Sequence, residues 1–315
     1  MGRDNLMCNA LAVAAATVMV AAAGLLGERE VIFPEIMALA VGALAAPRLA
    51  WRTSPARMVA LIAACSVAGV LVVRFLPAPP WVQAALAYAL CAAAFPFTGT
   101  TFAPMISAAV LPVILGTTSW VYPVSAVALT ALVAGLRQAL VRAGAREAQP
   151  FEPVSRPVAA DAPAIALRIV LGSAWVAACV AAGAPFCSAP PLLVAFTELS
   201  RPACPARRQP WKTILAIALC AAAGCVARAA LSCWLGLPLA LSAAAAAASA
   251  LAIMHALGRL LPPAGAMATL PMLVPEAALA AFPFQVLLGT SVLTFLALVC
   301  FGRPERYSVN GTTGR

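Results

Sequence analysis

The sequence predicts an all-helical protein that crosses a lipid membrane several times. Of its 315 residues, 64% are hydrophobic and only 10% are charged, and the mean hydropathy is +0.99. A soluble domain has roughly 45–50% apolar and about 25% charged residues. The apolar residues also fall in long runs, as membrane-spanning helices require. These observations favour a polytopic membrane protein over a water-soluble fold.

The second observation is that the two halves of the chain resemble each other. Prolines, glycines and a cysteine recur at matching places when the sequence is shifted by 155 to 160 residues. The matched pairs are Pro47 and Pro202, Arg52 and Arg207, Pro55 and Pro210, Cys65 and Cys220, Gly69 and Gly224, Gly99 and Gly258, Pro104 and Pro263, and Pro112 and Pro271. Many transporters are duplicated membrane units with a site between the halves.

Twelve apolar runs follow in chain order. They cover 6–27, 31–46, 58–76, 81–97, 98–116 and 118–136 in the first half, and 164–184, 188–200, 213–232, 239–257, 260–275 and 284–301 in the second. A full crossing needs about 20 residues. Four runs, 31–46, 98–116, 188–200 and 260–275, are short or broken and occupy matching places. We therefore expect two repeats of four to six crossings each, with short broken or re-entrant segments.

The first apolar run has the composition of a secretory signal, but we expect it to be retained as the first helix. The run from Leu6 to Leu26 is long enough to span a bilayer, whereas the apolar part of a signal peptide is shorter. It also has a counterpart at 164–184, at the start of the second half.

Charge predicts the orientation of the repeats. Arginines and a lysine gather in the loops 47–57 and 201–212 and in the segment 137–163, and such residues mark cytoplasmic loops. Glu28, Glu30 and Glu276 fall on the other side. Both termini are then cytoplasmic, each repeat crosses an even number of times, and the repeats are parallel, related by an axis along the membrane normal.

The expected organisation is a first transmembrane repeat (1–136), a cytoplasmic linker (137–163), a second repeat (164–302) and a cytoplasmic tail (303–315) in a bacterial inner membrane. The linker is too polar to span, and we expect it to be disordered or to pack loosely on the cytoplasmic face. The net charge of +10 does not indicate nucleic-acid binding, because the arginines lie in short loops and no zinc-finger spacing is present.

The residues needed for catalysis are scarce. The chain has a single histidine, His255, and its two aspartates, Asp4 and Asp161, lie outside the apolar runs. No cluster at metal-ligand spacing, phosphate-binding glycine loop or nucleophile elbow occurs in the sequence. We expect no enzyme activity, no metal and no cofactor.

Candidate substrate-binding residues lie at the two Gly/Pro breaks. They are Thr98, Gly99, Thr100, Thr101 and Pro104 in the first half, and Pro262, Pro263 and Gly265 in the second. Proline favours the first turn of a helix, so each break is interpreted as a helix start within the membrane. The positive end of a helix dipole suits an anion. The alternative interpretation is a simple turn from loop to helix.

Four charged or titratable residues near membrane depth complete the candidate set. Arg228 lies deep in its run, and His255 and Arg259 lie one helical turn apart. They are interpreted as contacts for an anion or a proton, or else as anchors at the membrane surface. Glu198 is the candidate for proton coupling, or else the partner of Arg201 in an ion pair at the interface.

The chain resembles the HPP family of integral membrane proteins, which is named for a His-Pro-Pro tripeptide. The segment Leu261-Pro262-Pro263-Ala264-Gly265-Ala266 carries the resemblance, together with Leu270-Pro271, Pro190-Pro191 and, in the first half, Ala103-Pro104. Leu261 stands where the family has its histidine, and the family's Gly-Ala-Ser segment is not evident near 195–197. The resemblance implies a small-anion permease, since nitrite transport has been attributed to some members.

Together these observations predict a secondary transporter or channel for a small solute, expected to be an anion. Its partners would be the lipid bilayer and a small-molecule or ion substrate, and a homo-oligomer is left open. The alternative is a membrane scaffold or partner subunit that does not transport. A scaffold would fill the space between the broken segments with side chains, whereas a transporter would leave polar groups facing an opening.

Overall fold

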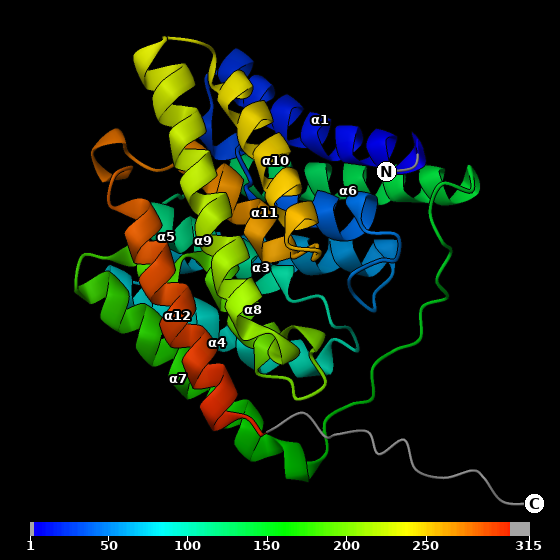
Figure 1. Cartoon of the computed structure of the whole chain (residues 1–315). Coiled ribbons are helices and arrows are strands. Elements are labelled where there is room, and N and C mark those ends of the chain that lie inside the picture. Colours follow the sequence, from blue (N-terminus) through cyan, green and yellow to red (C-terminus); the bar gives the residue numbers. More distant parts are fainter. Residues whose placement is uncertain (1–2, 303–315) are drawn as a thin grey trace, which may run out of the picture.

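The computed structural model describes residues 3–302, and over that range it contains helices and loops but no strands (Figure 1). The predicted tail, 303–315, lies outside the described residues. The α-helices are α1 (Arg3–Leu26), α2 (Glu35–Ala40), α3 (Pro55–Phe75), α4 (Pro80–Ala94), α5 (Pro104–Leu115), α6 (Val121–Arg142), α7 (Ala162–Ala181), α8 (Pro190–Leu199), α9 (Pro210–Ala227), α10 (Leu239–Ala256), α11 (Pro262–Thr269) and α12 (Phe282–Cys300).

Several helices continue into short 3₁₀ or π segments. The segments used below are η1 (Arg29–Val31), η2 (Val41–Ala45, after α2), η5 (Pro185–Ser188), η7 (Arg228–Trp234, after α9) and η8 (Leu270–Met272, after α11). Because η2 and η8 directly extend α2 and α11, each of these short helices makes about three turns.

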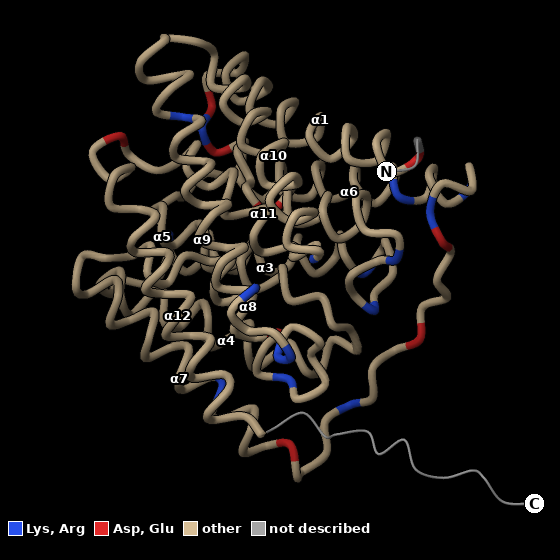
Figure 2. Tube along the Cα trace, in the orientation of Figure 1, with Lys and Arg blue, Asp and Glu red and all other residues tan. Residues whose placement is uncertain are grey.

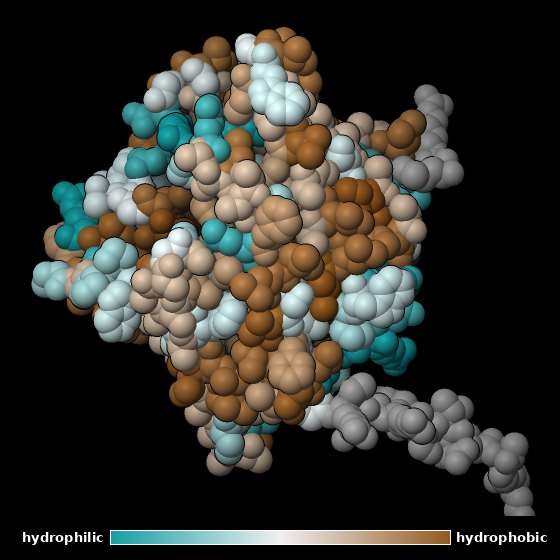
Figure 3. All heavy atoms as spheres, turned by 60° about the vertical axis from the view of Figure 1, so that its left-hand side comes forward, coloured by the Kyte–Doolittle hydropathy of each residue, from teal (hydrophilic) through white to brown (hydrophobic). Residues whose placement is uncertain are grey.

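Eight helices in the described part of the chain are long and apolar enough to cross a membrane: α1, α3, α4, α6, α7, α9, α10 and α12. Large apolar side chains stay exposed on them, and Leu25 is 89% exposed. Figure 3 shows apolar side chains over much of one face, with hydrophilic ones toward its edges. Such a surface suits lipid rather than water, so the predicted polytopic helical membrane fold is confirmed.

The other four helices, α2, α5, α8 and α11, are short and almost entirely buried. They fall within the four runs that the sequence marks as short or broken. Proline sets where they begin: α5, α8 and α11 carry it in their first turn, and Pro34 precedes α2. With η2 and η8 counted as parts of α2 and α11, and at 1.5 Å per residue, each helix is about 15–18 Å long, roughly half the thickness of the hydrocarbon core.

The short helices are packed in the same way in the two halves of the chain. α5 lies against α3 and α11 against α9, while α2 packs on α11 and α8 on α5. At Gly69 an added Cβ would lie 2.2 Å from the carbonyl oxygen of Ala109, and at Gly224 it would lie 2.1 Å from that of Ala268. Both glycines are needed because the backbones touch, as is common where helices pack in lipid.

The halves are joined by reciprocal contacts. α4 of the first half packs against α7 of the second, and α10 of the second packs against α1 of the first. α1 is thus an integral part of the bundle, with Cys8, Ala12, Ala16 and Met19 fully buried.

Arginines bind the carbonyl ends of helices that end inside the protein. Arg137 donates to Ala43 O at 3.0 Å, Arg146 to Ala45 O at 3.0 Å, and Arg207 to Leu199 O at 2.5 Å. The last carbonyls of a helix have no partner within it, and burying them unpaired is costly. The guanidinium groups supply the missing donors at these ends.

The linker differs from the loose segment that the sequence predicts. Between 143 and 158 it forms no helix, yet it lies along the basic loops and bonds to them. Val154 N donates to Gly99 O at 2.8 Å, and Glu147 pairs with Arg48 at 2.6 Å. The linker is thus bonded to the basic loops through both backbone and side-chain groups. Figure 2 shows most basic residues along these loops and the linker, while acidic positions of the segments 28–30 and 276–278 lie at the opposite end.

Candidate functional site

A narrow cavity of about 10 Å³ lies where the four short helices begin, which is room for about one water molecule. Its walls are Glu35 and Ala38 of α2, Pro104 of α5, Pro191 and Val194 of α8, and Pro262, Pro263 and Ala266 of α11. Every one of these residues lies in the first five positions of its helix. We call this space the central cavity.

Several residues that line the central cavity are paired by the shift that relates the two halves of the sequence. Shifts of 156 and 159 residues, within the range that relates the halves, pair Glu35 with Pro191, Ala38 with Val194, and Pro104 with Pro263. A cavity built from equivalent turns lies at the junction of the halves. Only one half contributes a carboxylate to it.

The electrostatic field in the central cavity follows from the helix ends. α5, α8 and α11 each present the positive end of the helix dipole, and each has proline in its first turn. Proline has no N–H, so these turns act on a solute through their field more than through direct hydrogen bonds. The result is a small, largely apolar space whose field favours negative charge.

Glu35 is the one charged side chain on the wall of the central cavity. It is 1% exposed, and its Oε1 accepts a hydrogen bond from the hydroxyl of Ser107. Within residues 3–302 its Oε2 has no hydrogen-bond partner. In that same range the one ion pair between side chains is that of Arg48 with Glu147, so no cation neutralises Glu35 directly. Glu35 was not among the residues predicted from the sequence, although a lone carboxylate in the short apolar run 31–46 was a signal.

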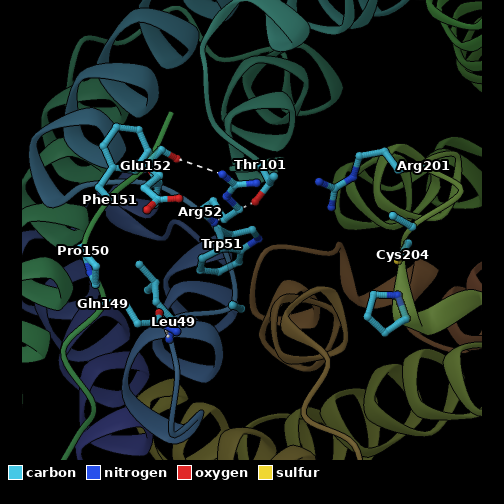
Figure 4. Close-up of a pocket in the computed structure, with 14 residues that line it drawn as sticks. Leu49, Trp51, Arg52, Thr101, Gln149, Pro150, Phe151, Glu152, Arg201 and Cys204 are labelled. Atoms are coloured by element: carbon cyan, nitrogen blue, oxygen red, sulfur yellow. Dashed lines mark hydrogen bonds between the residues drawn. The ribbon is translucent and has the colours of Figure 1, made fainter. Parts of the chain in front are cut away.

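A larger pocket of about 520 Å³ lies among the basic loops. We call it the basic pocket; it is lined by residues of 49–53, 149–152 and 201–205 and by Thr101. Arg52 and Arg201 point into it from opposite sides (Figure 4). Arg52 also donates to Glu152 O at 3.4 Å, whereas the buried Nε of Arg201 has no partner in the described chain. Two guanidinium groups that face one space suit an anion.

A third space, the opposite pocket, has a volume of about 520 Å³. Its wall includes Arg29 and Glu30 of η1, Ile114 and Leu115 of α5, and Leu270 and Leu273. Arg29 donates to Leu273 O at 3.1 Å, and the hydroxyl of Thr117 donates to Glu30. Its charged groups are thus already bonded.

The three spaces follow one another along the junction of the halves. η2 and α8 lead from the central cavity toward the basic pocket, which Leu49 and Arg201 line shortly after these helices end. α5 and η8 lead the other way, and Leu115 and Leu270 line the opposite pocket. Two short helices end to end cover about 30 Å, the thickness of the hydrocarbon core. The central cavity therefore lies near the midpoint of that distance.

The candidate residues of the two Gly/Pro breaks fall into two groups in the structure, the proline turns and the threonines. Pro104, Pro262 and Pro263 meet at the central cavity. Gly265 lies just beside it, where an added Cβ would lie 3.0 Å from Val41 Cγ2 and 3.1 Å from Met37 O. The structure thus brings the two proline turns together across the junction.

The threonines of the first break lie nearer the basic pocket. Thr101 lines that pocket, and its hydroxyl accepts from Arg52 N at 2.8 Å. Thr98 O accepts from Arg57 at 2.8 Å, and the hydroxyls of Thr98 and Thr100 are 3.0 Å apart. Gly99 adopts a φ of 66°, which favours glycine, and its carbonyl is covered by the linker.

The charged candidates do not reach the central cavity. Arg228 donates to the carbonyls of Pro271 and Val274, where the last turn of η8 ends. Arg259 donates to Pro205 O at 3.2 Å, and exposed His255 bonds Asn9 at 2.9 Å.

Glu198 lies at the other end of α8 from the central cavity. It accepts a hydrogen bond from Trp51 Nε1 at 3.0 Å, and Trp51 lines the basic pocket. The sequence placed Glu198 beside Arg201, and the contact with Trp51 is added by the fold.

No metal centre accompanies these spaces within residues 3–302, where no group of three or more His, Cys, Asp or Glu side chains is arranged to hold an ion. Comparison with known proteins adds no relative: no family model, curated protein or solved structure matches the chain. The function therefore has to be inferred from the geometry.

Proposed function

We propose that this protein is a secondary transporter or channel for a small anion, similar to an HPP-family permease, in a bacterial inner membrane. Its termini and the linker would be cytoplasmic, so that the basic pocket opens to the cytoplasm and the opposite pocket to the outside. A solute would pass from one pocket to the other through the central cavity.

The observation that carries this proposal is the meeting of four half-length helices at one cavity between two larger pockets. A helix that ends within the membrane leaves backbone N–H or C=O groups without partners in the helix. Such a helix end is tolerated where it lines a cavity or is buried in protein. Transporters place their sites at such interrupted helices. The space between the broken segments is narrow, and the charged side chain that faces it is that of Glu35.

Two features indicate that the solute carries a negative charge. Three helices with proline in the first turn direct positive dipole ends at the central cavity. In addition, Arg52 and Arg201 face the basic pocket without a carboxylate bonded to either guanidinium among the described residues (Figure 4). Both features raise the local concentration of anions.

Proteoliposomes containing the purified protein test the proposal. We expect saturable uptake of one or more small anions, with nitrite in the panel because of the HPP resemblance. Arg201→Ala should lower this uptake, since its guanidinium faces the pocket. Arg208→Ala is the matched control, because Arg208 is an exposed arginine of the same loop. Uptake no faster than in empty liposomes for any anion tested would refute transport and favour the scaffold.

A further inference from the structure

We propose that Glu35 carries the proton that moves with the anion, and that its carboxylate competes with the anion for the central cavity. This inference rests on the proposed function and names its coupling ion. It assigns to Glu35 the role that the sequence analysis gave to Glu198.

The geometry around the carboxyl group supports two states. Oε1 is held by the hydroxyl of Ser107, and Oε2 has no partner in the described chain, although the side chain is 1% exposed and lines the cavity. Burying a carboxylate without a cation is costly, and such groups within membranes serve as proton carriers. The free oxygen Oε2 is the atom at which a proton would bind.

The neighbouring elements supply no cation that would hold Glu35 permanently ionised. α2 packs against α1, α5, α6 and α11. The titratable groups of these helices, over the residues whose side chains are described, are Asp4 and Cys8 on α1 and Tyr122, Arg137 and Arg142 on α6. The hydroxyl of Tyr122 already donates to Ala108 O at 3.0 Å. Arg137 bonds the carbonyls at 43–47, at the other end of the helix.

Proton and anion would then bind together. When Glu35 is ionised, its negative charge occupies the positive field of the three helix starts and repels an anion. When a proton from water in the opposite pocket binds Oε2, the group becomes neutral and the field is free for an anion. Release of both into the basic pocket restores the carboxylate, so one proton and one anion cross in the same direction.

Glu35→Gln separates coupling from transport. The amide keeps a hydrogen-bonding group for Ser107 but cannot ionise. We expect Glu35→Gln liposomes to exchange anion across the membrane while losing uptake driven by a pH gradient and the accompanying proton influx. Glu28→Gln is the matched control, and it should keep both the gradient-driven uptake and the proton influx, because Glu28 is exposed and lies outside the central cavity. Gradient-driven uptake and proton influx that persist in Glu35→Gln would overturn the inference.

A second measurement on the native chain does not depend on transport or on the variant folding. Dicyclohexylcarbodiimide, an apolar reagent that modifies protonated carboxyl groups, should add to Glu35, with a rate that falls as pH rises. Mass spectrometry of the peptides would locate the adduct, and the exposed Glu147 is the internal comparison. No adduct at Glu35 would overturn its role as the proton site. Labelled Glu35 in a protein that moves no anion would instead refute the proposed function alone.

Discussion

Gly224→Ala tests the helix crossing on which the central cavity depends. The added methyl carbon would lie 2.1 Å from Ala268 O and 3.0 Å from Pro271 Cγ. Ordinary contacts of this kind are about 3.5–4.0 Å, so α9 and α11 would have to separate by more than 1 Å at a buried crossing. Overpacking of this kind costs about 1–3 kcal/mol, which outweighs the gain of about 1 kcal/mol that alanine brings to a helix.

The assay is thermal unfolding of the detergent-purified protein, followed by the loss of the folded peak in gel filtration. Gly69→Ala should behave like Gly224→Ala, because its Cβ would lie 2.2 Å from Ala109 O. Gly135→Ala in α6 is the control, since no atom of the described chain lies within 4 Å of its added Cβ. If both crossing variants unfold at the temperature of the control, the close approach at the two crossings is wrong.

The remaining predictions concern the arginine that binds the end of η8 and the orientation of the chain in the membrane. Arg228→Ala should lower the unfolding temperature, because the buried carbonyls of Pro271 and Val274 lose their donor at a cost of about 1–3 kcal/mol. Arg228→Lys should recover part of this loss. An unfolding temperature of Arg228→Ala equal to that of the wild type would contradict the capping role. Burial raises the pKa of the Cys204 thiol in the basic pocket. A variant in which Cys204 is the one remaining cysteine should therefore react slowly with a membrane-impermeant maleimide at neutral pH. Its reaction should speed up as rising pH forms thiolate, and it should occur from the cytoplasmic side. A variant with only Cys233, which is exposed in η7, should react from the outside; labelling of both from one side would refute the orientation.

The positions of the helices could be predicted from local sequence. Lengths of apolar runs and the prolines that begin α5, α8 and α11 are local properties, and the four short runs contain the four short helices. The pairing of Gly69 with Gly224 was also visible in the sequence. The backbone that each glycine contacts could not be predicted, because it depends on packing between distant segments of the chain.

The roles of the charged residues were the least predictable. A deeply placed arginine such as Arg228 suggests a substrate contact, but its carbonyl partners exist only because η8 ends inside the protein. Glu35 shows the reverse: its sequence signal was weak, and its importance comes from the meeting of α2 with Ser107 of α5 and with the prolines of α11. Sequence spacing does not encode such long-range contacts.

The central claim, that solute passes through the central cavity, is tested most directly by closing that cavity. Val194 lies on its wall, whereas Val226 is 66% exposed on the outer surface of α9. Val194→Trp and Val226→Trp would be compared for anion flux in proteoliposomes, at equal amounts of protein that elutes as a folded species. We predict that Val194→Trp abolishes the flux and that Val226→Trp leaves it at the wild-type rate. Wild-type flux through folded Val194→Trp would contradict the claim.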